Sequence, residues 1–134
     1  MKKELDEKLV KEYPTIFKNR YSKINESCMA WGFECGAGWY SIIDCLCRCI
    51  VEREKNLTDK EKTVFPVVAD QVKEKFGELR FYFSGGDEVI EGMVDMATEL
   101  SRHTCEDCGN TSTAKVRSNF GWLSTLCDTC AIKE

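Results

Sequence analysis

Cys105-Glu106-Asp107-Cys108 and Cys127-Asp128-Thr129-Cys130 are two CxxC pairs separated by the eighteen residues 109–126. Two residues between cysteines allow both sulfur atoms of a pair to reach one metal ion at about 2.3 Å, and a second pair completes a tetrahedron. Because four protein ligands leave no position for water or substrate, such a site stabilises a fold and does not carry out a reaction. The pattern predicts one structural Zn²⁺, and its ligands are Cys105, Cys108, Cys127 and Cys130.

Two CxxC pairs are also compatible with redox dithiols or with disulfide bonds. A redox CxxC is normally a single pair beside a βαβ pattern, which the sequence lacks, and an odd count of nine cysteines favours a reducing compartment. Zinc is therefore the favoured interpretation. Segments below about 40 residues usually need a metal or a disulfide to fold. We therefore expect a zinc-binding module at 105–134 after a core domain at 1–104, with Gly109 at positive φ.

The composition is that of an ordinary globular protein, with 43% hydrophobic and 31% charged residues in 134. No apolar run approaches the length of a membrane-spanning helix, and the first ten residues, MKKELDEKLV, contain no signal-peptide core. We therefore expect a cytoplasmic protein without a membrane partner. The net charge is −4, and acidic residues outnumber basic ones after residue 26. Binding to the phosphate backbone of nucleic acid is possible but disfavoured by this charge.

Hydrophobic periodicity predicts a compact helical core. A helix over residues 3–12 ends before Pro14, and a charged linker over 52–62 follows a central helix over 40–54. Another helix is expected over Val64–Phe76, with Gly77 as its stop. The apolar arc of the central helix consists of Ile42, Ile43, Leu46, Cys49 and Ile50.

The second half of the chain predicts a short β element and a last core helix. Leu79–Phe83 alternates as a strand, and Asp87 is a good N-cap for a helix that ends near Ser101. The buried stripe of that helix is expected to consist of Ile90, Met93, Val94, Ala97 and Leu100. Residues 115–117 and 122–126 form the arms of a hairpin between the two CxxC pairs. The expected fold is α+β, with a treble-clef-like or ribbon-like zinc module at the C-terminus.

Two aromatic segments are candidates for partner binding. Trp31, Trp39 and Tyr40 lie in a glycine-rich loop, and Arg80 shares a strand face with Tyr82. Trp, Tyr and Arg dominate binding hot spots. The loop aromatics are equally compatible with a lid on the core, and the strand face with a solvated surface. A nucleic-acid patch would consist of Lys73, Lys75, Arg80, Tyr82, Arg102, Lys115 and Arg117.

The remaining reactive residue types give no catalytic pattern. His103, the only histidine, lies beside a complete thiolate set, so a surface or capping role is expected. No small-molecule substrate is evident, and we expect no enzyme, although a reactive cysteine stays open as a third hypothesis. Cys45, Cys47 and Cys49 are expected to be core or boundary residues. The alternative is a second metal site made by these three cysteines, to which Cys28 and Cys35 could supply further ligands.

Three segments resemble a family of small uncharacterised phage and prophage proteins. They are WGFECGAGWY at 31–40, QVKEKFGELRFYFSGGD at 71–87, and CEDCG followed by GWLSTLCDTC at the C-terminus. Residues 105–130 alone also resemble the four-cysteine finger of the DksA and TraR type, whose long coiled-coil hairpin has no counterpart in this sequence. The first resemblance implies a compact accessory protein that ends in a zinc site.

Small phage proteins of this size often act by occupying a host protein, including components of antiviral defence. The resemblance therefore implies a non-enzymatic zinc-binding accessory protein that binds and modulates a host or phage protein. Inhibition of an antiviral defence system is one form that this function takes in such proteins. The alternative is a nucleic-acid-binding or transcription-modulating zinc-finger protein.

Overall fold

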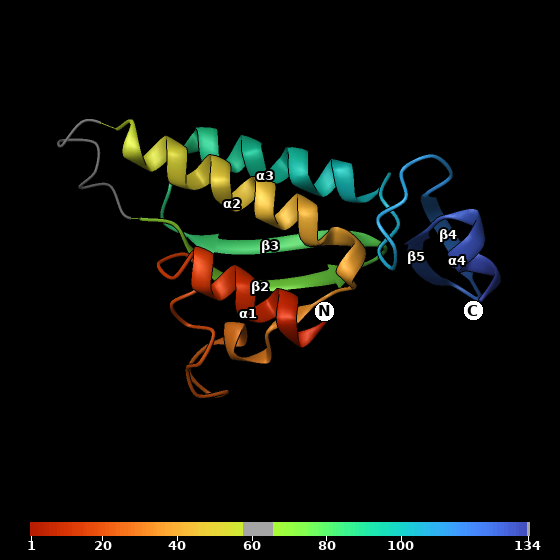
Figure 1. The fold of residues 1–134 in the computed structure, drawn as a ribbon, viewed down its shortest axis with the longest axis horizontal. Coiled ribbons are helices and arrows are strands. Elements are labelled where there is room, and N and C mark those ends of the chain that lie inside the picture. The colour runs from red at the N-terminus through yellow and green to blue at the C-terminus, as the bar shows by residue number, and fades with distance from the viewer. Residues whose placement is uncertain (58–65, 134) are drawn as a thin grey trace.

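The computed structural model describes residues 1–57 and 66–133, and it shows an α+β fold in which helices cover a small sheet (Figure 1). The longer elements are α1 (Lys3–Glu12), α2 (Tyr40–Lys55), β2 (Val68–Lys75), β3 (Glu78–Ser84), α3 (Glu88–Ser101), β4 (Lys115–Asn119), β5 (Trp122–Leu126) and α4 (Asp128–Ile132). Between α1 and α2 lie two single 3₁₀ turns and a short strand, η1 (Cys28–Trp31), β1 (Phe33–Glu34) and η2 (Ala37–Trp39).

Three of the four expected core helices are confirmed. α1 has the expected bounds, and α2 extends to Lys55, so the first part of the expected linker belongs to this helix. Residues 58–62 of that linker lie outside the described residues. α3 starts after Asp87, whose carboxylate accepts the N–H of Ile90 at 3.1 Å. This cap satisfies one of the free N–H groups of the first helical turn.

The inward faces of α2 and α3 differ from the expectation at four positions, two in each helix. Cys49 and Leu100 are exposed, whereas Cys47 and Ser101 are buried. Ser101 is tolerated in the core because its hydroxyl oxygen accepts the N–H of Leu79 at 2.8 Å. The hydrogen bond joins the end of α3 to the start of β3.

The helix expected over Val64–Phe76 is wrong where the structure describes the chain, because residues 68–75 form strand β2. Val64 and Phe65 lie outside the described residues. β2 pairs antiparallel with β3 and parallel with β1, and its register shifts between Ala69 and Gln71. This bulge leaves Ala69 and Val72 both buried, three residues apart. That spacing imitates the i, i+3 period of a helix, which explains the error.

Gly77 is therefore not a helix stop but half of a hairpin turn. Phe76 and Gly77 both have positive φ, 55° and 82°, between the paired residues Lys75 and Glu78. These angles define a type I′ turn, whose twist matches that of the strands. Residues 120–121 repeat the same Phe-Gly turn between β4 and β5.

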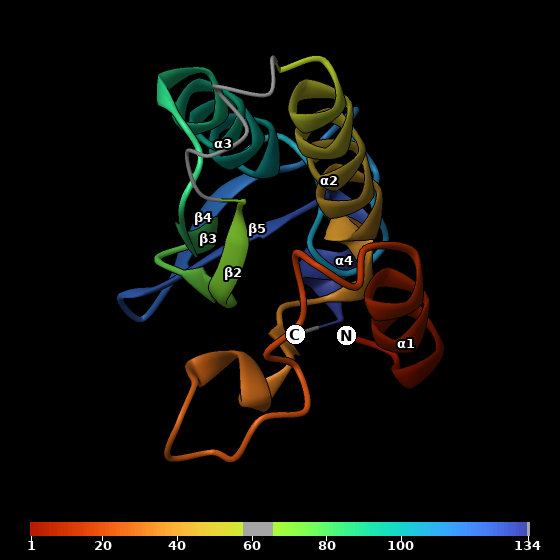
Figure 2. The same cartoon turned by 90° about the vertical axis from the view of Figure 1, so that its left-hand side faces the viewer.

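The helices and sheets are arranged in layers with the zinc module at one end. Figures 1 and 2 show α2 and α3 side by side over the sheet of β1, β2 and β3, with β4, β5 and α4 gathered beyond one end of it. The hydroxyl of Tyr13 donates to Asp44 at 2.6 Å, which joins the end of α1 to α2. Burial and this hydrogen bond raise the pKa of Tyr13. Within the described part of the chain, no helix combines the length and the apolar character needed to cross a bilayer.

We expect Asp87→Ala to lower the free energy of unfolding by about 1 kcal/mol, because the cap of α3 is lost. Asp87→Asn keeps a capping oxygen and removes only the ion pair with Arg53, at 2.7 Å, so it should cost a few tenths of a kcal/mol. Urea unfolding at neutral pH measures both. The hydrogen bond from Arg53 lowers the pKa of Asp87. The advantage of aspartate over asparagine should therefore shrink as the pH falls below about 4, and growth of that advantage in acid would contradict the account.

Candidate metal centre

The four cysteine sulfur atoms of the CxxC pairs converge on one point. Each lies within 4.8 Å of the other three. Cys108 Sγ and Cys127 Sγ, which belong to different pairs, are 3.7 Å apart. A zinc ion with Zn–S bonds of about 2.3 Å in a tetrahedron requires sulfur atoms about 3.8 Å apart, whereas a disulfide requires about 2.05 Å. Four soft thiolate donors at tetrahedral spacing fit one structural Zn²⁺.

The first pair is held by a tight knuckle after Thr104. The N–H of Cys105 donates to the carbonyl of Asn110 at 2.8 Å, and the N–H of Gly109 donates back to Cys105 at 2.9 Å. Gly109 has φ of 85°, as the sequence predicts. These two backbone bonds therefore hold together the knuckle that carries both sulfur atoms.

The second pair is held by the start of α4. Cys127 is the N-cap of this helix, and its Sγ accepts the N–H of Cys130 at 3.4 Å. This backbone hydrogen bond lowers the pKa of Cys127 to about 7. Since zinc binds the thiolate form, the cap favours the state that ligates. Knuckle, hairpin and helix follow one another in the chain, and this order is treble-clef-like, one of the two forms that the sequence predicts.

The knuckle packs directly against the loop that precedes α2. Gly38 N–H donates to the carbonyl of Glu106 at 2.7 Å, and Gly36 N–H donates to Glu106 Oε2 at 2.9 Å. Trp39 Nε1 donates to the carbonyl of Thr104 at 2.8 Å. A Cβ on Gly38 would overlap the carbonyl oxygen of Cys105. The glycines of this loop therefore allow close approach to the zinc module, which the sequence does not reveal.

A second junction joins the two hairpins. Thr125 is fully buried, and its hydroxyl donates to the carbonyl of Gly77 in the turn between β2 and β3. A Cβ on Gly77 would lie 3.3 Å from Val116 and 3.4 Å from the backbone N of Ser124. The turn thus rests on the middle of the β4–β5 hairpin. The zinc module contacts the core at two separate places.

The aromatic residues expected to bind a partner lie in different environments. Trp39 is completely buried, which agrees with the alternative of a lid on the core, and it offers no contact surface in this fold. Tyr40 is half-buried, with Lys8 Nζ 5.7 Å from its ring centroid. Tyr82 is 41% exposed on β3, and Arg80 beside it is paired with Glu78 at 2.6 Å. The strand face is therefore only partly open.

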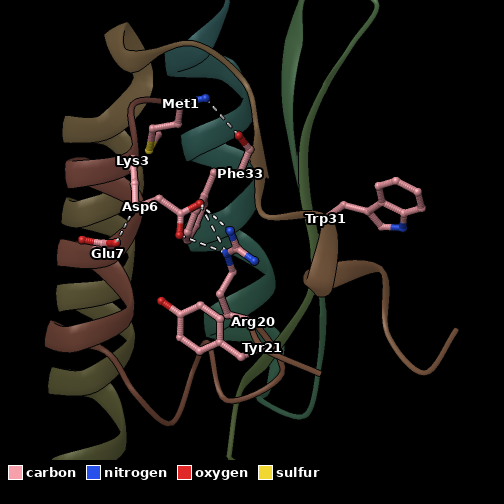
Figure 3. A pocket seen from close by; sticks show the side chains of 8 residues that line it. All are labelled: Met1, Lys3, Asp6, Glu7, Arg20, Tyr21, Trp31 and Phe33. Atoms are coloured by element: carbon pink, nitrogen blue, oxygen red, sulfur yellow. Dashed lines mark hydrogen bonds and ion pairs between the residues drawn. The ribbon is translucent and has the colours of Figure 1, made fainter. Parts of the chain in front are cut away.

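Trp31 is 58% exposed at the edge of a pocket of about 440 Å³ (Figure 3). Its ring points away from the pair of Asp6 and Arg20 at the centre of the view. Arg20 Nε and Nη2 donate to the two carboxylate oxygens of Asp6 at 2.9 and 3.0 Å. Because this carboxylate neutralises the guanidinium, the pocket offers no free cation at that point to an anionic ligand.

The other cysteines and the histidine lie outside the zinc centre. Within the described residues, none of them belongs to a cluster of three or more potential metal ligands. Burial raises the pKa of Cys35 to about 12, with the Glu106 carboxylate as a further cause, and burial raises that of Cys47. Both side chains are therefore neutral thiols at pH 7. His103 lies 3.1 Å from Glu99 on the surface.

The basic residues considered for nucleic-acid binding are partly neutralised. Arg117 lies 2.6 Å from Asp128, and Arg102 lies 3.8 Å from Glu78. Since Arg80 is also paired with Glu78, each of the three arginines in the expected patch has a carboxylate partner. A continuous track of free cations for phosphates is not formed by these side chains.

Comparisons of the chain with protein-family models, curated proteins and solved structures give no match. The zinc assignment rests on the sulfur geometry described above.

We expect Cys105→Ser and Cys127→Ser each to release zinc and to unfold the C-terminal module, because a structural site with three thiolates loses most of its affinity. Elemental analysis of the purified protein measures zinc content, and near-ultraviolet circular dichroism reports the packing of the aromatic side chains, including the buried Trp39. Cys28→Ser, at an exposed cysteine outside the centre, is the control. Full zinc occupancy in either ligand variant would show the assignment to be wrong.

We expect Gly38→Ala to lower the free energy of unfolding by about 2 to 3 kcal/mol, because its Cβ has no space against the knuckle. Gly92→Ala is the matched control. A Cβ on Gly92, in α3, would meet no atom of the described residues within 4 Å, so this variant should gain up to about 1 kcal/mol. Denaturant unfolding gives both values. Equal behaviour of the two variants would contradict the role of Gly38.

Proposed function

We propose that this is a non-enzymatic accessory protein, stabilised by one zinc ion, that acts by binding another protein. The observation that carries the proposal lies on the β4–β5 hairpin. Phe120 at its tip is fully exposed, and Trp122 is 74% exposed. Large aromatic side chains held in solvent on a rigid support are typical of protein-binding hot spots. The zinc centre supplies that support, because Cys127 follows β5 directly.

The state of the cysteines supports a role without catalysis. Four thiolates close the coordination sphere of the metal, so no position is left to activate water or substrate. Outside the centre, Cys35 and Cys47 carry raised pKa values, and desolvation also raises the pKa of Cys49. A thiol nucleophile needs a lowered pKa instead. These features favour binding over chemistry.

The resemblance of three segments to small phage and prophage proteins supports a host or phage protein as the partner. On the same ground, we place components of host antiviral defence among the candidate targets. Nucleic acid is the weaker alternative, because the chain has a net charge of −4 and the arginines of the expected patch are paired with carboxylates.

The proposal predicts that one protein co-purifies with the tagged, zinc-loaded chain from its native cells in a fixed ratio. The double variant Phe120→Asn with Trp122→Ser should reduce this capture at least about tenfold, because it removes the exposed aromatic contacts. Ile24→Asn is the control, because it alters an exposed apolar residue that is distant in sequence from the β4–β5 hairpin. The complex should form again from the two purified proteins.

Two results would contradict the proposal. One is a wild-type protein that captures no protein in a fixed ratio. The other is rapid and selective alkylation of one cysteine outside the zinc set at neutral pH, which would indicate an activated thiol and an enzyme.

A further inference from the structure

The two Phe-Gly turns lie at the same end of the molecule, with a pocket of about 290 Å³ between them. Its walls are residues 73–76, at the end of the first hairpin, and residues 121–123, at the start of β5. We call this pocket the hairpin groove. The contact of Gly77 with Val116 and Ser124 holds its two walls together.

Both turns contain a backbone conformation that is unfavourable for their residues. Phe76 and Phe120 have φ of 55° and 52°, in the left-handed region. This region is unfavourable for a residue with a Cβ, and type I′ turns normally use Asn, Asp or Gly there. Packing inside the protein does not compensate, since Phe76 is 66% exposed and Phe120 is fully exposed. Uncompensated strain of this kind clusters at binding sites.

The groove combines aromatic side chains with positive charge. Lys73 and Lys75 belong to one wall, and Lys75 Nζ lies 5.6 Å from the centroid of the Phe76 ring. The acidic residue between them, Glu74, uses one oxygen to accept the N–H of Gly77 at 2.7 Å. The charged residues that line the groove are Lys73, Glu74 and Lys75, so its lining carries a net positive charge in a chain of net charge −4.

We propose that the hairpin groove binds an acidic peptide segment of a partner protein that carries an aromatic or large aliphatic side chain. The apolar side chain packs against Phe76 and Trp122, which line the groove, and beside Phe120, which precedes the lining residue Gly121. The acidic residues lie against Lys73 and Lys75. This inference rests on the proposed function, since it names the chemistry of the protein partner. Rim charges of this kind steer association and select partners.

A single-stranded nucleic acid would use the same aromatic rings by stacking, so it is the competing occupant. Two features favour the peptide. The groove is short, whereas affinity for a polyanion grows with the number of phosphates that lysine and arginine neutralise. The remainder of the chain is acidic, which repels a long polyanion but not a short peptide that ends near the groove.

The test begins with a displayed library of random peptides of about twelve residues, selected on the zinc-loaded protein. We expect the enriched peptides to combine Asp or Glu with Phe, Trp or Leu. A fluorescein-labelled copy of the most enriched peptide is then measured by anisotropy at about 0.15 M ionic strength. A single-stranded oligothymidylate and a single-stranded RNA of similar length are measured beside it.

The double variant Phe76→Asn with Phe120→Asn is the decisive one. Asparagine tolerates the left-handed conformation, so this variant should unfold at the same or a higher denaturant concentration while it binds the peptide at least about tenfold more weakly. Lys73→Glu with Lys75→Glu should weaken binding to a similar extent and reduce its dependence on salt. Ile24→Asn should change neither affinity nor stability strongly, because it alters an exposed apolar residue outside the groove.

Three results would overturn the inference. The first is a selection that enriches no peptide, or only peptides without acidic residues. The second is equal peptide affinity for the wild type and the double phenylalanine variant, and the third is competition by the oligonucleotides at equal affinity. The proposed function can stand when the inference fails. If both groove variants capture the native partner as well as the wild type does, the protein binds through another surface. If the wild type itself captures no protein, the proposed function fails.

Discussion

The hydrogen bond from Gly38 N–H to the carbonyl of Glu106 joins the metal knuckle to the start of α2. It is possible only because a glycine at this position leaves space for the carbonyl oxygen of Cys105. Trp39, the next residue, fills the core and donates to Thr104. Zinc binding therefore stabilises more than the C-terminal segment. The knuckle that carries two of the ligands also positions the indole of Trp39, on which the core packs.

The second contact between the zinc module and the core is the hydrogen bond from the Thr125 hydroxyl to the carbonyl of Gly77. One contact alone would allow the zinc module to pivot, whereas two separated contacts fix its orientation on the core. The β4–β5 hairpin then lies against the turn between β2 and β3, and the walls of the hairpin groove come from both. The metal thus acts at a distance on the proposed binding surface, because it sets the position of one wall relative to the other.

Local patterns predict the parts of the structure that local interactions determine. The zinc ligands follow from their spacing, α3 from Asp87 and its period, and the zinc hairpin from the segment between the CxxC pairs. β2 could not be predicted in the same way, since its bulge imitates helical spacing and its identity depends on pairing with distant strands. The role of Gly38 was hidden for the same reason. The Phe-Gly turns could not be predicted either, because the usual sequence signals of a type I′ turn are Asn-Gly and Asp-Gly.

The positive φ of Phe76 and Phe120 has a consequence for how the sequence can drift over generations. At most exposed positions a substitution is close to neutral, but at these two a change to asparagine or glycine relieves the backbone. Selection for stability alone would therefore remove both phenylalanines. A lineage that lost the ligand of this surface would be expected to lose them early, while its four zinc-binding cysteines persisted.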